Sequence, residues 1–247
     1  MYDNNKLTGK AAEMYRKIEE QFSDDPTVQL TLSEYYKKNN NKQKYEEYVK
    51  KLVTNKSLDA DVQLGILGPM IIEGGNDSTM RRQGLEIITI LAEQHPENSK
   101  VAAFYGDVLA YNNKIDKAAE AYKKSISIDP SSYKVWESLL FAYTDKAGAD
   151  SLIKYSERAL KLFPNQAMFH YLNGVGYMNK KDYTKSIKAI TRAIDMQPED
   201  NKPQLVQMYT GLGDVYNLAK RYTASDSSYD YALKLDPMNA TVLNNYA

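Results

Sequence analysis

The sequence predicts an all-α fold in which short antiparallel helix pairs stack side by side as a solenoid. Four prolines each end a stretch with helical periodicity, at successive spacings of 34, 34 and 39 residues: Pro130, Pro164, Pro198 and Pro237. A small residue recurs at a fixed distance before each proline, and apolar residues recur at three- and four-residue intervals. Self-similarity at such a period is the sequence signature of an array of helical hairpins.

Composition excludes several classes of protein. Hydrophobic residues make up 43% of the 247 residues, which is enough for a buried core, and the 32 basic and 32 acidic residues cancel. A chain without net charge does not attract nucleic acid through a general field, so no nucleic-acid partner is expected. The chain has no cysteine, which excludes disulfides, thiolate metal sites and a thiol nucleophile.

Targeting signals are missing from the sequence. No apolar run is long enough to cross a bilayer, and the N-terminal residues lack the apolar core of a signal peptide. We therefore expect a soluble chain without direct membrane insertion. Its compartment would be the cytoplasm, or the periplasm if a parent protein carries an export signal.

The clearest units span 99–132, 133–166, 167–200 and 206–239. Numbered from the first residue of each unit, slots 4, 7, 8 and 11 form one apolar stripe, and slots 20, 24 and 27 form a second. Slots 8, 20 and 27 hold small residues, which are predicted to let the two helices of a hairpin approach closely. Proline at slot 32 ends the second helix, because the residue before proline is pushed out of the helical region. Polar clusters at 112–114 and 179–182 are predicted to turn the chain within a hairpin.

The slots resemble the tetratricopeptide repeat, whose pattern is Trp-x2-Leu-Gly-x2-Tyr, then Ala-x3-Phe-x2-Ala, then Pro. In unit 133–166 the matching residues include Trp136, Tyr143, Ala159 and Pro164. The resemblance covers residues 99–239 and implies a right-handed α-solenoid of antiparallel helix hairpins. Leu140 departs from the small slot, so the two helices are expected to lie farther apart there.

Upstream of residue 99 the pattern is looser. Residues 25–57 are interpreted as a divergent repeat, and residues 58–98 as an extended divergent repeat with seven extra residues. Gly68-Pro69 is expected to kink or break the first helix of that extended repeat, because Pro69 lacks a backbone N–H. Ser78 is the expected N-cap of the second helix.

Both ends of the chain are interpreted as cut repeats within one solenoid over residues 1–247. Residues 7–24 fit the second helix of a truncated repeat, and residues 240–247 fit the start of a further first helix. The chain is therefore expected to be an excerpt of a longer array. Apolar faces at these ends would offer a surface for self-association; their residues are Tyr15, Ile18, Leu243 and Tyr246.

Catalytic constellations are not evident. The two histidines, His95 and His170, lie at a helix end and at an inward-facing slot, so both are expected to be structural. No Ser-His-Asp set or paired carboxylates can be assigned from the sequence. We therefore predict a chain that is not an enzyme and has no catalytic residue, metal or cofactor.

The resemblance implies that a partner peptide binds on a concave face formed by the first helices of the hairpins, at slots 2, 5, 6, 9, 12 and 13. In unit 206–239 these slots hold Gln207, Thr210, Gly211, Asp214, Asn217 and Leu218. Over all units, the candidate partner-binding residues are Lys100, Asp107, Tyr111, Lys134, Glu137, Phe141, Met168, Tyr171, Val175, Met178, Asp214 and Asn217. An apolar centre within a charged rim is typical of a peptide-binding surface. The alternative is that some of these side chains pack against the neighbouring repeat.

The functional prediction is a non-catalytic protein–protein interaction scaffold that binds a partner peptide or helix in its concave groove. The alternative is a targeting or regulatory arm of a larger protein, such as a sensor kinase or glycosyl transferase, with the catalytic part outside this chain. Slots 5 and 9 lack the Lys and Asn of a chaperone-tail carboxylate clamp, so the sequence does not identify the partner.

Overall fold

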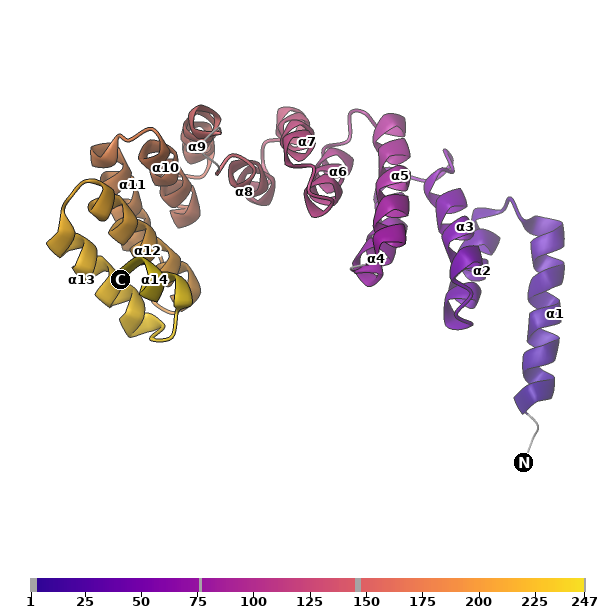
Figure 1. Cartoon of the computed structure of the whole chain (residues 1–247). Helices are drawn as coiled ribbons and strands as arrows, with labels where there is room; N and C mark the ends of the chain where they lie inside the picture. Colours follow the sequence, from indigo (N-terminus) through magenta and orange to yellow (C-terminus); the bar gives the residue numbers. More distant parts are fainter. Residues whose placement is uncertain (1–3, 76, 145–147, 247) are drawn as a thin grey trace. The chain divides into compact units, whose positions relative to one another are not determined.

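The computed structural model describes residues 4–75, 77–144 and 148–246, and it confirms the all-α prediction. Within these ranges every regular element is a helix, from α1 to α14 (Figure 1). The chain divides into two compact units, Met1–Asn113 and Lys114–Ala247. Each unit has its own succession of packed helices.

The first unit consists of helices that pack on their neighbours in chain order. They are α1 (Asn4–Phe22), α2 (Pro26–Lys38), α3 (Lys42–Val53), α4 (Ala60–Gly74), α5 (Ser78–Gln94) and α6 (Ser99–Tyr111). Helix α3 also contacts α5, and α4 also contacts α6. These contacts between next-but-one helices are those expected of stacked hairpins.

The second unit continues with α7 (Ile115–Ile128), α8 (Tyr133–Phe141), α9 (Ala149–Leu162), α10 (Ala167–Asn179), α11 (Tyr183–Met196), α12 (Lys202–Leu218), α13 (Tyr222–Leu235) and α14 (Ala240–Tyr246). Helix α10 packs between α9 and α11, and α12 packs on α13. In addition, α10 contacts both α8 and α12. The first helices of three successive hairpins therefore lie next to one another and present one common face.

The predicted close approach within hairpins is confirmed at two glycines. A Cβ added to Gly174 would lie 2.5 Å from Ile190 Cγ1, and one added to Gly213 would lie 2.4 Å from a ring carbon of Tyr229. In both hairpins a buried serine of the second helix donates to the glycine carbonyl. Ser186 Oγ and Ser225 Oγ each do so at 2.8 Å. The hydroxyl thus satisfies a polar partner where the helices touch.

The predicted turns within hairpins are also confirmed, and they share one backbone feature. The chain adopts a positive φ at Asn40 (54°), Asn113 (58°), Lys181 (63°) and Lys220 (60°). Each residue follows the end of a first helix, where a left-handed residue lets following N–H groups bond the last helical carbonyls. Asparagine tolerates this conformation better than lysine does.

Lys181→Gly is expected to stabilise the chain by about 0.5–1 kcal/mol, because glycine adopts a left-handed conformation without the Cβ clash. Thermal unfolding followed by circular dichroism measures the gain. Lys188→Gly, inside α11, is the control and should cost about 0.5–1 kcal/mol. Equal losses from both substitutions would contradict the role assigned to the left-handed turn.

For the first unit, the break expected at Pro69 and the N-cap expected at Ser78 were both wrong. Helix α4 runs as one helix through Pro69, and Gly65, one turn earlier, is exposed, so water can bond its carbonyl. The N-cap of α5 is Asp77 rather than Ser78. The Asp77 carboxylate accepts from Thr79 N at 2.8 Å and Met80 N at 3.2 Å. A negative charge at a helix N-terminus is more favourable than a neutral hydroxyl.

Both histidines make structural contacts. His95 Nε2 lies 2.7 Å from Gln63 Oε1, and His170 Nε2 lies 3.0 Å from the carbonyl oxygen of Pro164. Because a carbonyl only accepts, His170 carries a proton on Nε2. Trp136 occupies the same slot one repeat earlier, and its Nε1 donates to the carbonyl of Pro130 at 2.9 Å. The side chain at slot 4 therefore connects its helix to the preceding proline by a hydrogen bond.

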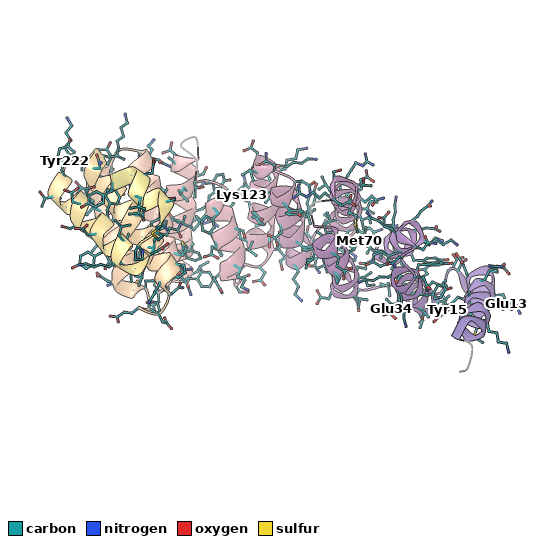
Figure 2. The ribbon with its side chains drawn as sticks, turned by 60° about the horizontal axis from the view of Figure 1, so that its bottom comes forward. Glu13, Tyr15, Glu34, Met70, Lys123 and Tyr222 are labelled. Atoms are coloured by element: carbon teal, nitrogen blue, oxygen red, sulfur yellow. The ribbon has the colours of Figure 1, made fainter. Side chains whose placement is uncertain are left out.

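A polar cluster and a pair of stacked rings anchor α1. Tyr15 points from α1 towards α2, while Glu13 lies on the other side of α1 (Figure 2). The rings of Tyr15 and Tyr35 stack with centroids 4.0 Å apart. The Glu19 carboxylate accepts hydrogen bonds from the Tyr36 hydroxyl at 2.5 Å, from the Tyr48 hydroxyl at 2.8 Å and from the Lys44 ammonium group.

Glu19→Gln is expected to lower the free energy of unfolding by about 1–2 kcal/mol at pH 7, because it removes the charge from these bonds. Burial raises the pKa of Glu19, but the bonds from Lys44, Tyr36 and Tyr48 outweigh it and hold the pKa below its ordinary value. The added stability is complete above the unfolded pKa of about 4.3 and is lost as pH falls through the native pKa.

Urea unfolding at pH 7 and near pH 3 tests this prediction: the difference between Glu19→Gln and the parent should shrink in acid. Glu13→Gln is the control, because the ion pair of Glu13 with Lys17 is largely exposed and should matter by less than about 0.5 kcal/mol. A difference that persists at the acidic pH would show that the charge of Glu19 is not its cause.

Candidate functional site

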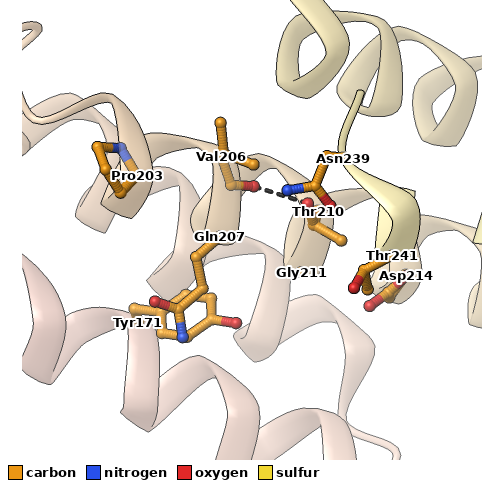
Figure 3. Close-up of a pocket in the computed structure, with 9 residues that line it drawn as sticks. All are labelled: Tyr171, Pro203, Val206, Gln207, Thr210, Gly211, Asp214, Asn239 and Thr241. Atoms are coloured by element: carbon orange, nitrogen blue, oxygen red, sulfur yellow. Dashed lines mark hydrogen bonds between the residues drawn. The ribbon is translucent and has the colours of Figure 1, made fainter. Parts of the chain in front are cut away.

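A cavity of about 330 Å³ lies in the second unit on the face shared by α10, α12 and the start of α14 (Figure 3). Helix α10 contributes Tyr171, and α14 with its preceding residue contributes Thr241 and Asn239. The remaining lining residues come from α12: Pro203, Val206, Gln207, Thr210, Gly211 and Asp214. Most of the wall is thus one face of α12, with residues at three- and four-residue spacing.

Gly211 determines how Tyr171 lies in this cavity. A Cβ at Gly211 would stand 2.9 Å from Tyr171 Cε2 and 3.0 Å from the Tyr171 hydroxyl. The absence of a side chain on α12 therefore lets the tyrosine ring of α10 lie against the α12 backbone. Tyr171 is consequently only 8% exposed, although it borders the cavity.

The charge state of the lining is set by burial and by one carboxylate. Burial, followed by the negative charge of Asp214, raises the pKa of Tyr171 to about 12, and a hydrogen bond with Gln207 opposes the shift. The Tyr171 hydroxyl is therefore neutral at pH 7. Burial and a hydrogen bond to Asp214 likewise raise the pKa of Tyr229.

Asp214 is held in a fixed position. Its Oδ1 accepts from the Tyr229 hydroxyl at 2.7 Å and from Asn245 Nδ2 at 3.0 Å. Both bonds end on the same oxygen, so Oδ2 remains able to accept from a bound group. Thr210 Oγ1 donates to the carbonyl of Val206 at 2.7 Å (Figure 3) and keeps its lone pairs for a ligand N–H.

The arrangement suits recognition by hydrogen bonding. The cavity is bordered by the amide groups of Gln207 and Asn239, the hydroxyls of Thr210 and Thr241, and the Asp214 carboxylate, next to Pro203, Val206 and the Tyr171 ring. Polar groups held at fixed positions can fix the orientation of a bound chain. Among the described residues, no three His, Cys, Asp or Glu side chains are grouped so as to hold a metal ion. In the same part of the chain, no helix is long and apolar enough to cross a membrane.

The structure brings two of the candidate residues together in the cavity, Tyr171 and Asp214. The other candidates of the second unit lie outside its lining and differ in exposure. Met168 is buried, while Glu137, Val175 and Met178 are half-buried. Lys134, Phe141 and Asn217 are exposed. Burial raises the pKa of the Glu137 carboxyl above its ordinary value, although the positive charge of Lys134 opposes this shift.

Three candidates belong to α6 in the first unit. The Lys100 ammonium pairs with Asp61 at 2.7 Å. The Tyr111 hydroxyl donates to the carbonyl of Gly75, and Asp107 is exposed. The Lys100 and Tyr111 side chains thus contact residues of their own unit.

Sequence reasoning missed four residues of the cavity: Pro203, Val206, Asn239 and Thr241. Pro203 was overlooked because the repeat was expected to start at residue 206, whereas α12 begins at Lys202. The signal was present, since Asn201 precedes the helix and proline is favoured in the first helical turn.

The faces at the two chain ends differ in burial. Tyr15 and Ile18 are half-buried against the first unit. Leu243 is 46% exposed and Tyr246 is 38% exposed.

The tetratricopeptide-repeat family model matches residues 100–132 and 174–200. Among curated proteins, the chain is 24% identical over 79 residues to the E3 ubiquitin-protein ligase CHIP of Arabidopsis thaliana, which is 32% of this chain and 28% of that protein. It is 26% identical over 128 residues to Superkiller protein 3 of Saccharomyces cerevisiae, which is 49% of this chain and 8% of that protein. The chain therefore spans well under half the length of the curated relatives it matches.

Solved structures share the fold at low sequence identity. The C-terminal part of a tetratricopeptide-repeat protein from Cytophaga hutchinsonii matches with a TM-score of 0.64 and 14% identity, over 99% of this chain and 96% of that chain. MamA from Desulfovibrio magneticus RS-1 matches with a TM-score of 0.61 and 15% identity, over 73% of this chain and 97% of that chain. YrrB is described as a tetratricopeptide-repeat protein with an unusual peptide-binding site. It matches with a TM-score of 0.56 and 11% identity, over 94% of this chain and 96% of that chain.

This fold is consistent with a protein–protein interaction scaffold, and proteins that have it are generally non-catalytic. The second matched segment includes Gly174 and Ser186, where α10 and α11 touch, and the solved structures share the fold. The chain therefore contains segments that match the tetratricopeptide repeat, and it shares the fold of tetratricopeptide-repeat proteins.

Proposed function

We propose that this chain is a non-catalytic scaffold that binds an extended peptide or a helix of a partner protein along the common face of α10, α12 and α14. The cavity over Tyr171 carries the proposal, because it combines a buried aromatic wall with amide, hydroxyl and carboxylate groups that suit a peptide backbone. Exposed Lys134, Phe141 and Asn217 would extend the contact on the first helices. The peptide-binding site named for YrrB supports this proposal by analogy of fold.

Gln207→Trp tests the proposal, since Gln207 is exposed and borders the cavity. Peptides would be selected on the parent chain from a random display library, and the affinity of a selected peptide measured by titration calorimetry. The indole should fill the cavity and weaken binding at least about tenfold, which corresponds to about 1.4 kcal/mol.

Ser227→Trp, on the exposed side of α13, is the matched control and should leave the affinity unchanged. Circular dichroism should show both variants as helical as the parent. If both tryptophans weaken binding equally, or neither does, the peptide binds elsewhere and the proposed site is wrong.

A second candidate is a repeat arm within a larger protein whose catalytic part lies outside these residues. The curated relatives favour it, because the chain matches only 28% and 8% of their lengths. Reading the gene on both sides of this segment tests it: an adjoining kinase or transferase domain would support the arm, and a stop codon with no adjoining domain would refute it.

A further inference from the structure

A second and larger cavity, about 760 Å³, lies in the second unit over a different face of α10. It is lined by His170, Asn173 and Tyr177 from α10 and by residues of α11: Lys185, Lys188, Ala189, Thr191, Arg192 and Asp195. On α10 these positions alternate with Tyr171, Val175 and Met178 of the common face, so the two surfaces are presented by separate sides of the helix. We call this second surface the basic groove.

The walls of the basic groove are fixed by contacts within the fold. Asn173 Nδ2 donates to Ser156 Oγ at 2.9 Å, and His170 bonds the Pro164 carbonyl. The Tyr177 hydroxyl donates to Glu157 at 2.7 Å. Each polar side chain of the α10 side thus has a partner within the fold, and the Tyr177 ring of α10 and Ala189 of α11 add apolar surface to the groove.

The α11 side carries an excess of positive charge. Lys185 pairs with Asp182 at 2.9 Å and lies 5.0 Å from the centre of the Tyr177 ring. Lys188 and Arg192 are exposed, and among the residues that the structure describes neither has an ion pair or an aromatic partner. Two like charges four residues apart weaken an isolated helix slightly, so helix stability does not explain this pair.

We propose that the basic groove binds an acidic segment of a partner protein, whose carboxylates pair with Lys188 and Arg192 while its chain lies over Ala189 and Tyr177. The spacing of the cations fits such a ligand. Four helical residues rise about 6 Å. Side chains two residues apart on one side of an extended peptide are about 6.6–6.8 Å apart, so carboxylates at that spacing match Lys188 and Arg192.

The lining favours an acidic peptide over a nucleic acid. Asp195 closes one end of the groove and Glu157 borders the other side through Tyr177, so a continuous phosphate backbone would meet negative charge. A peptide can place a backbone N–H or a hydroxyl at those positions. The net charge of the whole chain is zero, so attraction is confined to this local group of cations.

Fluorescence anisotropy of a short labelled peptide of alternating glutamate and serine tests the proposal on the full chain. Binding should saturate and weaken when NaCl rises from about 0.05 to 0.5 M, because exposed pairs are screened. The double variant Lys188→Glu/Arg192→Glu should bind the peptide at least about tenfold more weakly. A peptide with lysine in place of glutamate should not bind the parent chain.

Lys124→Glu is the matched control, because Lys124 occupies on α7 the slot that Arg192 occupies on α11, and it lies outside the groove lining. It should leave the affinity unchanged. Equal losses for Lys124→Glu and the double variant would show nonspecific charge attraction and overturn the proposal. So would a failure of the peptide to saturate, or tighter binding of an oligonucleotide of equal charge.

The test is independent of the cavity over Tyr171. Gln207→Trp should not affect the acidic peptide, and Lys188→Glu/Arg192→Glu should not affect a peptide selected for the common face. If Gln207→Trp abolished binding of the acidic peptide, that peptide would be held by the other cavity and the basic groove would be refuted.

Discussion

Trp136→Ala is expected to lower the free energy of unfolding by about 3–5 kcal/mol, the range for removing a buried aromatic side chain. Trp136 is the only tryptophan of the chain and is 1% exposed on α8. Alanine leaves a cavity there and removes the hydrogen bond from the indole to the Pro130 carbonyl. Because native domains are stable by only about 5–15 kcal/mol, this single change removes a large share of that stability.

Urea unfolding followed by circular dichroism measures this loss, with Phe141→Ala as the control on the same helix. Phe141 is 44% exposed, so its truncation should cost less than about 1 kcal/mol. Trp136→Phe should lie between, because it keeps most of the packing but leaves the carbonyl without its donor. Equal costs for Trp136→Ala and Phe141→Ala would contradict the assignment of Trp136 to the core.

The candidate partner-binding residues differ in how far they are buried. The slot of a residue in the repeat does not determine its burial, because burial also depends on the side chains of the neighbouring helix. Tyr171 is buried only because Gly211, on the next first helix, leaves room for its ring. Phe141 occupies a comparable slot and is exposed. Internal packing therefore applies to Tyr171, whereas the part of Phe141 in partner binding stays a prediction.

Much of the fold could be predicted because small residues act locally and at fixed spacing. Gly174 and Ser186 stand twelve residues apart, and that spacing places the serine hydroxyl at the glycine carbonyl. The turn at Lys181 follows from the same hairpin geometry. The expected break at Pro69 did not occur: the carbonyl that loses its donor can bond water there, and this exposure is not visible in the sequence.

The candidate site was predicted in part. Gln207, Thr210, Gly211 and Asp214 occupy slots expected on the binding face, and all four line the cavity. The contributions of the following segment, Asn239 and Thr241, depend on where α14 lies against α12, which no repeat pattern specifies. The basic groove was not predicted, because its cations belong to second helices, whose exposed positions carry no signal in the repeat.

Gly174→Ala is expected to cost roughly 3 kcal/mol, at the upper end of overpacking effects, because the neighbours cannot yield. The new Cβ would lie 2.5 Å from Ile190 Cγ1, 3.1 Å from the Ser186 carbonyl oxygen and 3.3 Å from the Ile190 backbone nitrogen. Ile190 is fully buried, and two of the three contacts are backbone atoms of α11. The helices would have to separate, which also weakens the bond from Ser186 to the Gly174 carbonyl.

Trp136 emission reports the loss, since the only tryptophan of the chain lies in the second unit with Gly174. Gly65→Ala is the control: nothing lies within 4 Å of a Cβ at Gly65, so alanine should stabilise α4 by up to about 1 kcal/mol. Ile190→Ala should relieve part of the clash, so the double variant Gly174→Ala/Ile190→Ala should lose less than the sum of the single losses. If the two single losses in the free energy of unfolding simply added, the cost of Gly174→Ala would not arise at the contact between α10 and α11. That result would contradict the claim that Gly174 determines how closely the two helices approach.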